Sequence, residues 1–324
     1  MRPRHYPILD AVRFICALVV ALHHLAPPPL ISKLGLESLY RIFWFGPSGV
    51  AVFFVISGFC IHLPYEEGRE PKVLWFYIRR YIRIGGPLLL VLPLAYLTKM
   101  SYAPQGGWVT WSLVCEASYY LAYPALLGLS RRWGWKILIG IGFVLGAVAT
   151  WFSRQQESSS ILFYAKIIVG SLPLWLLGCL LAEQRSETRS TGGLAVIGWR
   201  AVAIGGSVLV AALHYHRVIH LDYTLPFLGL VIYRWLYAEL AVPPKHWWLA
   251  GLGAWSYSLY LVHIVSYAMV DHLHLEHFHF FRHQPAMAWA LKIGWALLFA
   301  YGFFIVVERP SHRLARSIAA SRGA

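Results

Sequence analysis

Charged residues are scarce in this chain. Asp, Glu, Lys and Arg make up 13% of its 324 residues and hydrophobic types make up 58%, whereas soluble globular proteins carry about twice that share of charge. Acidic residues are the rarer sign, with 14 Asp and Glu against 28 Lys and Arg. This composition excludes an ordinary water-soluble protein, and we expect lipid to surround the chain.

Cysteine is rare as well, and long polar stretches are missing. The four cysteines lie in apolar runs and have no CxxC spacing: Cys16, Cys60, Cys115 and Cys179. Neither a disulfide framework nor a cysteine-rich zinc site is therefore indicated, and we expect all four to be small buried hydrophobic side chains. Because no polar insert is long enough to fold alone, we expect residues 1–324 to form a single membrane-embedded domain.

Long apolar runs recur along the whole sequence. A window of about 19 residues selects about ten candidate spans. They cover residues 8–26, 46–64, 85–103, 108–129, 134–153, 161–182, 194–214, 221–241, 249–271 and 287–307. The predicted fold is all-α, a polytopic integral membrane helical bundle with about ten transmembrane helices. The first run lacks a small-residue cleavage site, so we expect a retained helix and not a removed signal peptide.

Basic residues are spread unevenly over the predicted loops. With the N-terminus in the cytoplasm, one set of loops receives most of them, including Arg69, Arg131 and Arg185, and the other set receives few, such as Lys33 and Arg217. The positive-inside rule therefore predicts that both termini are cytoplasmic. Orientation in the membrane accounts for the net charge of +14, and we expect no nucleic-acid partner.

Ionisable residues within spans are costly and are functional candidates. Arg13 and His24 lie in the first span. On an ideal helix they are about three turns apart, so both side chains leave one face about 16 Å apart along the axis. The alternative is that Arg13 pairs with Asp10, three residues before it, and that His24 is an interfacial histidine.

A second candidate is a basic aromatic segment just before the predicted span 85–103. In this segment Arg79, Arg80 and Arg83 lie within little more than one helical turn of one another. Arginines stacked in this way can clamp phosphates through forked hydrogen bonds, at the place where a cytoplasmic phosphorylated donor would arrive. The alternative is a helix that rests on anionic lipid headgroups.

A third candidate is the carboxylate of Glu116, which shares a helical stripe with Tyr119, Tyr120 and Tyr123. A carboxylate in a membrane interior needs a partner, such as a histidine, an arginine or a substrate hydroxyl. We therefore expect Glu116 to orient a histidine or to bind sugar hydroxyls. A purely structural ion pair is the alternative.

A fourth candidate is the polar face formed by Ser256, Tyr260 and His263 at i, i+4 and i+7. We expect Tyr120, Tyr260 and His263 to contribute to substrate binding. Hydrogen bonding between helices is the alternative for this face.

Histidines crowd the segment between the last two spans. They are His272, His274, His277, His279 and His283. Such density could hold zinc or copper, but the spacing matches no specific metal motif. We therefore predict no metal site.

Taken together, these segments resemble the membrane acyltransferase family 3, whose members transfer acyl groups from cytoplasmic acyl-coenzyme A to acceptors such as cell-envelope sugars. The resemblance spans nearly the whole chain. It rests on Leu9-Asp-Ala-Val-Arg13 with His24, Phe53-Phe-Val-Ile-Ser-Gly-Phe59, Arg80-x-x-Arg83, Trp111-Ser-Leu-Val-Cys-Glu116, Ser256-Tyr-Ser-Leu-Tyr-Leu-Val-His263 and Glu308-Arg-Pro. The order of these motifs on the predicted spans makes the set specific.

The resemblance implies a role for each matching residue. His24 would be the catalytic histidine, with Arg13 its companion and Glu116 a helper. Arg80 and Arg83, with Arg79 beside them, would contact the coenzyme A phosphates. It also implies acetyl-coenzyme A as the donor, membrane lipid and a carbohydrate or glycolipid acceptor as partners, and a bacterial inner (plasma) membrane as the location.

Two local features depart from the family pattern. Ala11 replaces the glycine usual after Leu-Asp, and Gly85-Gly86-Pro87 replaces a shorter link from the arginine pair to its proline. Two routes stay open for the reaction, namely general-base catalysis by His24 and an acyl-histidine intermediate. Other protein classes are a secondary transporter of a small anion or proton-coupled solute and a non-catalytic membrane scaffold.

Overall fold

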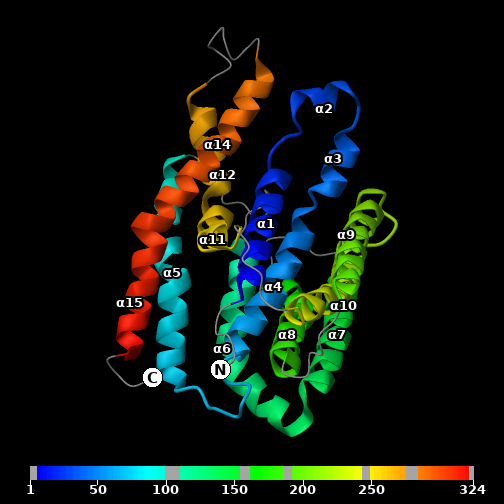
Figure 1. Cartoon of the computed structure of the whole chain (residues 1–324), viewed down its shortest axis with the longest axis vertical. Helices are drawn as coiled ribbons and strands as arrows, with labels where there is room; N and C mark the ends of the chain where they lie inside the picture. The colour runs from blue at the N-terminus through cyan, green and yellow to red at the C-terminus, as the bar shows by residue number, and fades with distance from the viewer. Residues whose placement is uncertain are drawn as a thin grey trace. The chain divides into compact units, whose positions relative to one another are not determined.

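The computed structural model describes residues 6–98, 110–153, 161–185, 192–242, 249–274 and 284–320. Within these ranges the regular elements are helices (Figure 1). The long ones are α1 (Pro7–His23), α4 (Gly46–His62), α5 (Val73–Leu97), α6 (Thr110–Trp133), α7 (Trp135–Phe152), α8 (Ile161–Gln184), α9 (Gly193–Tyr215), α10 (Leu221–Leu240), α12 (Ser256–His272) and α14 (Pro285–Phe303). The shorter ones are α2 (Pro29–Lys33), α3 (Glu37–Phe43), α11 (Ala250–Gly253), the π-helix η4 (Phe304–Glu308) and α15 (Arg309–Ala320). The prediction of an all-α fold is confirmed for the described part of the chain.

Six helical stretches are long and apolar enough to cross a membrane. They are Glu37–His62, Val73–Leu97, Trp135–Phe152, Phe163–Gln184, Gly193–Tyr215 and Pro285–Ile318. The fold is therefore that of an integral membrane protein. The count of about ten spans and the cytoplasmic placement of both termini stay predictions.

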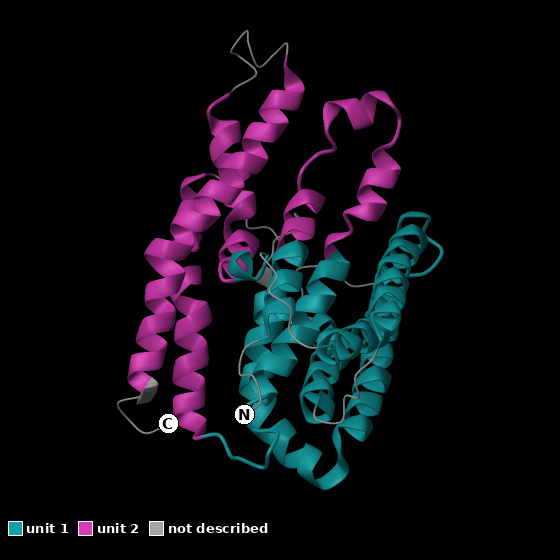
Figure 2. Cartoon of the chain, in the orientation of Figure 1, with its two compact units in different colours: residues 1–16, 47–71, 110–253 teal, residues 17–46, 72–109, 254–324 magenta. Residues whose placement is uncertain are grey.

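The chain divides into two compact units, which Figure 2 shows in different colours. Unit 1 comprises residues 1–16, 47–71 and 110–253, and unit 2 comprises residues 17–46, 72–109 and 254–324. Each unit draws on three separate stretches of chain, so neither matches a continuous piece of sequence. The single membrane domain stays a prediction.

Helix α5 begins earlier than the span predicted over 85–103. It starts at Val73, so Arg79, Arg80 and Arg83 lie inside the helix and not before it. A hydropathy window loses the helix where three arginines lower the average, although charged side chains do not interrupt backbone hydrogen bonds. The arginines are therefore held on the same rigid element as the apolar span.

Helices α4 and α8 approach closely in unit 1 through two glycines. A Cβ atom built on Gly58 would lie 1.9 Å from the carbonyl oxygen of Trp175, and one built on Gly178 would lie 2.0 Å from that of Val55. Small residues allow such backbone contact between helices in a membrane. The contact explains the glycine in the Phe53–Phe59 motif.

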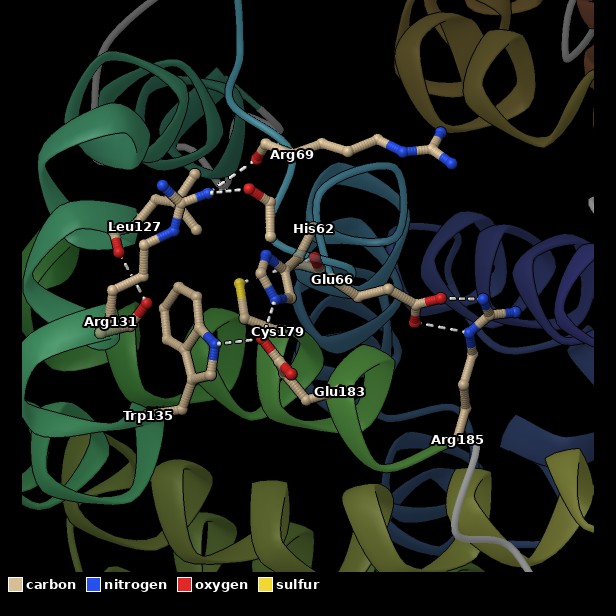
Figure 3. Close-up of polar contacts among 12 residues, drawn as sticks. His62, Glu66, Arg69, Leu127, Arg131, Trp135, Cys179, Glu183 and Arg185 are labelled. Carbon is tan, nitrogen blue, oxygen red and sulfur yellow. Dashed lines mark hydrogen bonds and ion pairs between the residues drawn. The ribbon is translucent and has the colours of Figure 1, made fainter.

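Within unit 1, two arginines bind the segment after α4 to the ends of α6 and α8 (Figure 3). Arg185 donates to Glu66 at 2.6 Å, and this hydrogen bond raises the pKa of the guanidinium. Arg131 donates to the backbone oxygens of Gly68 and Arg69 at 3.0 and 2.8 Å. The ends of α4, α6 and α8 therefore lie together.

In unit 2, a buried cluster joins the end of α1 to α12 and α14. It consists of Leu25, Tyr267 and Ala296, with Trp289 and Ile293 packed against it. Burial of these side chains holds the neighbourhood of His24 in place.

The cysteine prediction is wrong at one position. Cys16, Cys115 and Cys179 are buried, as expected, but Cys60 is exposed. Because the lipid-facing surface of a membrane helix is as apolar as its interior, an apolar run does not tell which side a residue faces. All four cysteines belong to the described residues, and none forms a disulfide.

The close contact of α4 and α8 predicts that Gly178→Ala lowers the thermal stability of the purified protein. The new Cβ would meet the backbone of α4, and overpacking of this kind costs about 1–3 kcal/mol. Gly205→Ala on α9 is the matched control, because nothing lies within 4 Å of the Cβ it adds. We expect the control to be neutral or stabilising by up to about 1 kcal/mol. An unchanged melting temperature for Gly178→Ala would contradict the contact.

Candidate active site

His24 occupies the first position beyond the end of α1, in unit 2. Its Nδ1 lies 2.9 Å from the carbonyl oxygen of Val20 and 3.3 Å from Nε2 of His263. His24 is partly exposed, whereas the side chain of His263 is completely buried. The accessible imidazole of His24 therefore contacts the inaccessible imidazole of His263.

The hydrogen-bond partners assign the tautomers of both rings. Nδ1 of His263 lies 2.8 Å from the carbonyl oxygen of Tyr260 and 3.2 Å from that of Leu259. A carbonyl oxygen only accepts, so this Nδ1 carries the proton and Nε2 of His263 has the lone pair. Nδ1 of His24 faces that lone pair and a second carbonyl oxygen, so it carries a proton too. The lone pair of His24 is therefore on Nε2, which is the atom a base or nucleophile needs.

The adjacent histidine has a different environment. Nδ1 of His23 lies 3.0 Å from the backbone oxygen of Trp44. Its ring covers Gly46, where a Cβ atom would come within 2.9 Å of the imidazole. His23 therefore joins the end of α1 to the chain before α4, and His24 is the histidine with a partner suited to proton transfer.

Helices α5 and α12 run in the same direction and are linked near both ends of α12. The hydroxyl of Tyr257 donates to the backbone oxygen of Ile84 at 3.2 Å, and Nε2 of His272 lies 2.8 Å from that of Thr98. With the helices aligned in this way, His263 on α12 lies at the same height along the helix axes as the residue ten positions after Arg80 on α5. At 1.5 Å per residue the two levels are about 15 Å apart along the axis.

The predicted phosphate-binding arginines project from α5 in the same unit. The guanidinium of Arg80 lies 5.7 Å from the ring centre of Phe76. Within the described residues, neither Arg79 nor Arg83 pairs with a carboxylate. An anion from outside the chain can therefore meet their charge.

Glu308 fixes the start of the helix that carries His263. Its side chain is buried, and Oε2 accepts hydrogen bonds from the backbone N–H of Ser258, at 3.1 Å, and from the Ser258 hydroxyl. A carboxylate at a helix N-terminus also meets the positive end of the helix dipole. The Glu308-Arg-Pro motif therefore contributes to the placement of α12.

Glu116 lies in unit 1, where hydroxyl groups are its hydrogen-bond donors. Oε1 accepts from Ser57 at 2.7 Å and from Tyr120 at 2.5 Å. The other tyrosines of the predicted stripe bond elsewhere, Tyr119 to the backbone of Ile168 and Tyr123 to a histidine. Within the described residues, Oε2 of Glu116 has no hydrogen-bond partner.

Arg13 also belongs to unit 1. Its guanidinium lies 3.7 Å from a carboxylate oxygen of Asp10, so the ion pair considered for this residue is present. A common face for Arg13 and His24 stays a prediction.

A buried cluster around His62 was not predicted from the sequence (Figure 3). Nε2 of His62 lies 2.8 Å from Glu183 and Nδ1 lies 3.0 Å from the hydroxyl of Tyr123. Trp135 donates to the same carboxylate at 3.3 Å. His62 is completely buried and both of its ring nitrogens have partners, so this cluster joins α4, α6, α7 and α8.

Metal ligands are not gathered in the described residues, where no group of three His, Cys, Asp or Glu side chains could hold an ion. His277, His279 and His283 lie outside the described ranges. The prediction for the histidine-rich segment therefore stays untested.

Comparison with known proteins adds one match. A family model described as an acyltransferase domain, that of acyltransferase family 3, matches residues 6–307. The matched range includes His24, His263, Glu116, Arg13 and the three arginines of α5, and it ends one residue before Glu308. No curated protein and no solved structure matches the chain.

Proposed function

The chain belongs to acyltransferase family 3, and we propose that it moves an acetyl group from cytoplasmic acetyl-coenzyme A to a hydroxyl of a cell-envelope carbohydrate. Its family and its apolar helices make it a membrane acyltransferase. The donor, the acceptor, the acyl group and a bacterial inner membrane as the location belong to the proposal. The observation that carries it is the pair of contacts at Nδ1 of His24, 2.9 Å from the carbonyl oxygen of Val20 and 3.3 Å from Nε2 of His263, from which we infer that the lone pair lies on Nε2.

The arrangement of unit 2 suits a donor that is charged at one end and reactive at the other. Coenzyme A bears phosphates at its nucleotide end and the thioester at the end of a narrow arm. Arg79, Arg80 and Arg83 would hold the phosphates through forked hydrogen bonds. The level of His263 lies about 15 Å further along the helix axes, a separation that the arm would bridge.

His24 acts as the general base in the proposed reaction. Its Nε2 takes the proton of the acceptor hydroxyl while the oxygen attacks the thioester carbonyl. The carbon–sulfur bond then breaks, and the departing thiolate takes the proton from Nε2. Base catalysis of this kind contributes roughly 10²- to 10⁴-fold.

In the proposed reaction His263 positions His24, and the substrate-binding role that the sequence suggested for it stays untested. The side chain of His263 is completely buried and that of Tyr260 is 6% exposed. Nε2 of His263 and the carbonyl oxygen of Val20 both face Nδ1 of His24. These contacts hold the His24 ring in place while its Nε2 takes the proton of the acceptor hydroxyl. They strengthen when His24 becomes an imidazolium.

Glu116 contributes to acceptor binding. Ser57 and Tyr120 donate to Oε1 and keep the carboxylate oriented. Oε2 would accept a hydrogen bond from an acceptor hydroxyl, which is the group a carbohydrate offers in abundance. Arg13 takes no step in this mechanism, because Asp10 lies beside its guanidinium.

Thiol release from acetyl-coenzyme A tests the donor and the base together. We expect His24→Gln to lower kcat by about 10²- to 10⁴-fold with donor binding retained, because only the proton acceptor is lost. The double variant Arg80→Gln/Arg83→Gln should instead raise KM for the donor, because phosphate contacts are lost. Both are measured on the purified protein in nanodiscs with envelope glycans present.

Two exposed or partly exposed residues of unit 1 serve as matched controls for this experiment. His216→Gln removes one imidazole and Arg69→Gln removes one guanidinium, and both should behave as the wild type. Full turnover in His24→Gln would contradict the assignment of the base. A protein that neither binds the donor nor releases thiol would favour the transporter alternative.

Replacing the carboxylate of Glu116 tests the acceptor side. Glu116→Gln keeps the shape of the side chain but removes its charge, and we expect turnover to fall about ten- to hundredfold, the loss of one hydrogen bond to a charged group. Donor binding should be unaffected. Glu67→Gln, an exposed glutamate, is the control. Unchanged turnover in Glu116→Gln would remove this residue from the mechanism.

A further inference from the structure

One exposed arginine of unit 1 lies between two aromatic rings. The guanidinium carbon of Arg234, on α10, is 5.5 Å from the ring centre of Trp199 on α9 and 5.6 Å from that of Tyr237. Cations at such distances are attracted to the ring faces. A guanidinium that stacks on aromatic rings through its faces keeps the N–H groups at its edge available for hydrogen bonds.

The carboxylate of Glu239, five residues after Arg234 on α10, pairs with Arg200. Arg200 donates to both oxygens of Glu239, at 2.6 and 2.9 Å, and Trp235 donates to Oε1 at 2.8 Å. Glu239 is buried. Within the described residues, no carboxylate pairs with Arg234.

The pair between Arg200 and Glu239 also fixes the level of Arg234. It joins the beginning of α9 to the end of α10, so these helices run in opposite directions (Figure 1). Arg234 lies six residues before the end of α10, about 9 Å along its axis. If α10 spans the membrane as the sequence predicts, a guanidinium at this depth is close to the boundary between hydrocarbon and headgroups.

The surface around Arg234 is apolar. Phe227 and Leu230, which precede it on the same stripe of α10 at i−7 and i−4, are 62% and 41% exposed, and Ile197 on α9 is 60% exposed. Such a surface faces lipid in a membrane protein. Arg234 contacts the ring of Tyr237, one turn nearer the end of α10, and arginines near helix ends extend toward the headgroups.

We propose that Arg234 binds the phosphate of an anionic membrane lipid, with Trp199 and Tyr237 holding the guanidinium in place. The guanidinium edge matches two phosphate oxygens. The acyl chains would lie along Phe227 and Leu230. Because the site lies on the lipid-facing surface and carries the positive charge of Arg234, the phosphate comes from a lipid with a net negative headgroup. This proposal does not depend on the acyl donor or acceptor.

Native mass spectrometry of the full-length protein in neutral detergent tests the site. Phosphatidylglycerol is titrated as the anionic lipid, phosphatidylcholine as a zwitterionic lipid with the same phosphodiester, and glycerol 3-phosphate as a soluble phosphate. We expect the wild type to bind phosphatidylglycerol in preference to the other two. Arg234→Gln should weaken that binding about tenfold or more, the effect of losing a hydrogen bond to a charged group.

Arg132→Gln is the matched control. Arg132 is another exposed arginine of unit 1 and makes no ring contact or ion pair within the described residues. It should bind phosphatidylglycerol as the wild type does. Trp199→Leu keeps the charge of Arg234 and removes one ring, so its binding should fall between those of the wild type and Arg234→Gln, and it carries the test if Arg234→Gln does not fold.

Three results would overturn the proposal. Equal loss of binding in Arg132→Gln and Arg234→Gln would mean general attraction by positive charge. Equal binding of both lipids would mean that the site does not select an anionic headgroup. Displacement of the lipid by glycerol 3-phosphate would mean a site for soluble phosphates.

Discussion

The proposed chemistry depends on the hydrogen bond that Nδ1 of His24 makes with the carbonyl oxygen of Val20. This contact puts the imidazole proton on Nδ1 and the lone pair on Nε2. His263 adds a second acceptor for the same proton, and its own Nδ1 is fixed by the backbone of its helix. A neutral histidine thus stands where hydrolase triads have a carboxylate. It orients the base without bringing a further charge into an apolar environment.

The position of His263 depends in turn on how α12 is held. Glu308 binds the start of the helix, and Tyr257 and His272 bind it to α5 near its two ends. Because α5 also carries Arg80 and its neighbours, the same contacts set the spacing between the arginines and the histidines. The distance between phosphate binding and acyl transfer is therefore a property of two helices packed in parallel, and it does not rely on a loop.

Hydropathy was enough to predict an all-α membrane fold, because a polypeptide in lipid must satisfy its hydrogen bonds within helices. It misplaced the start of α5, where arginines lower the average, and it could not show that Cys60 faces outward. The motifs contained His24 and Glu116 together with their partners, but they did not show which residues pair. His62 and Glu183 lie 121 residues apart in the sequence, and no local pattern reveals a pair formed only by packing. Burial also depends on packing, so the sequence did not show that His263, which we expected to bind the substrate, is completely buried.

The tautomer of His24 is the most direct test of this account. Protein labelled with ¹⁵N at histidine would be studied by NMR in nanodiscs, and the His24 signals would be assigned by their absence from His24→Gln. We predict that Nδ1 of His24 has the chemical shift of a protonated nitrogen and that Nε2 has that of a nitrogen with a lone pair. The opposite tautomer, with the proton on Nε2, would contradict the account, because the atom assigned to take the acceptor proton would already carry one.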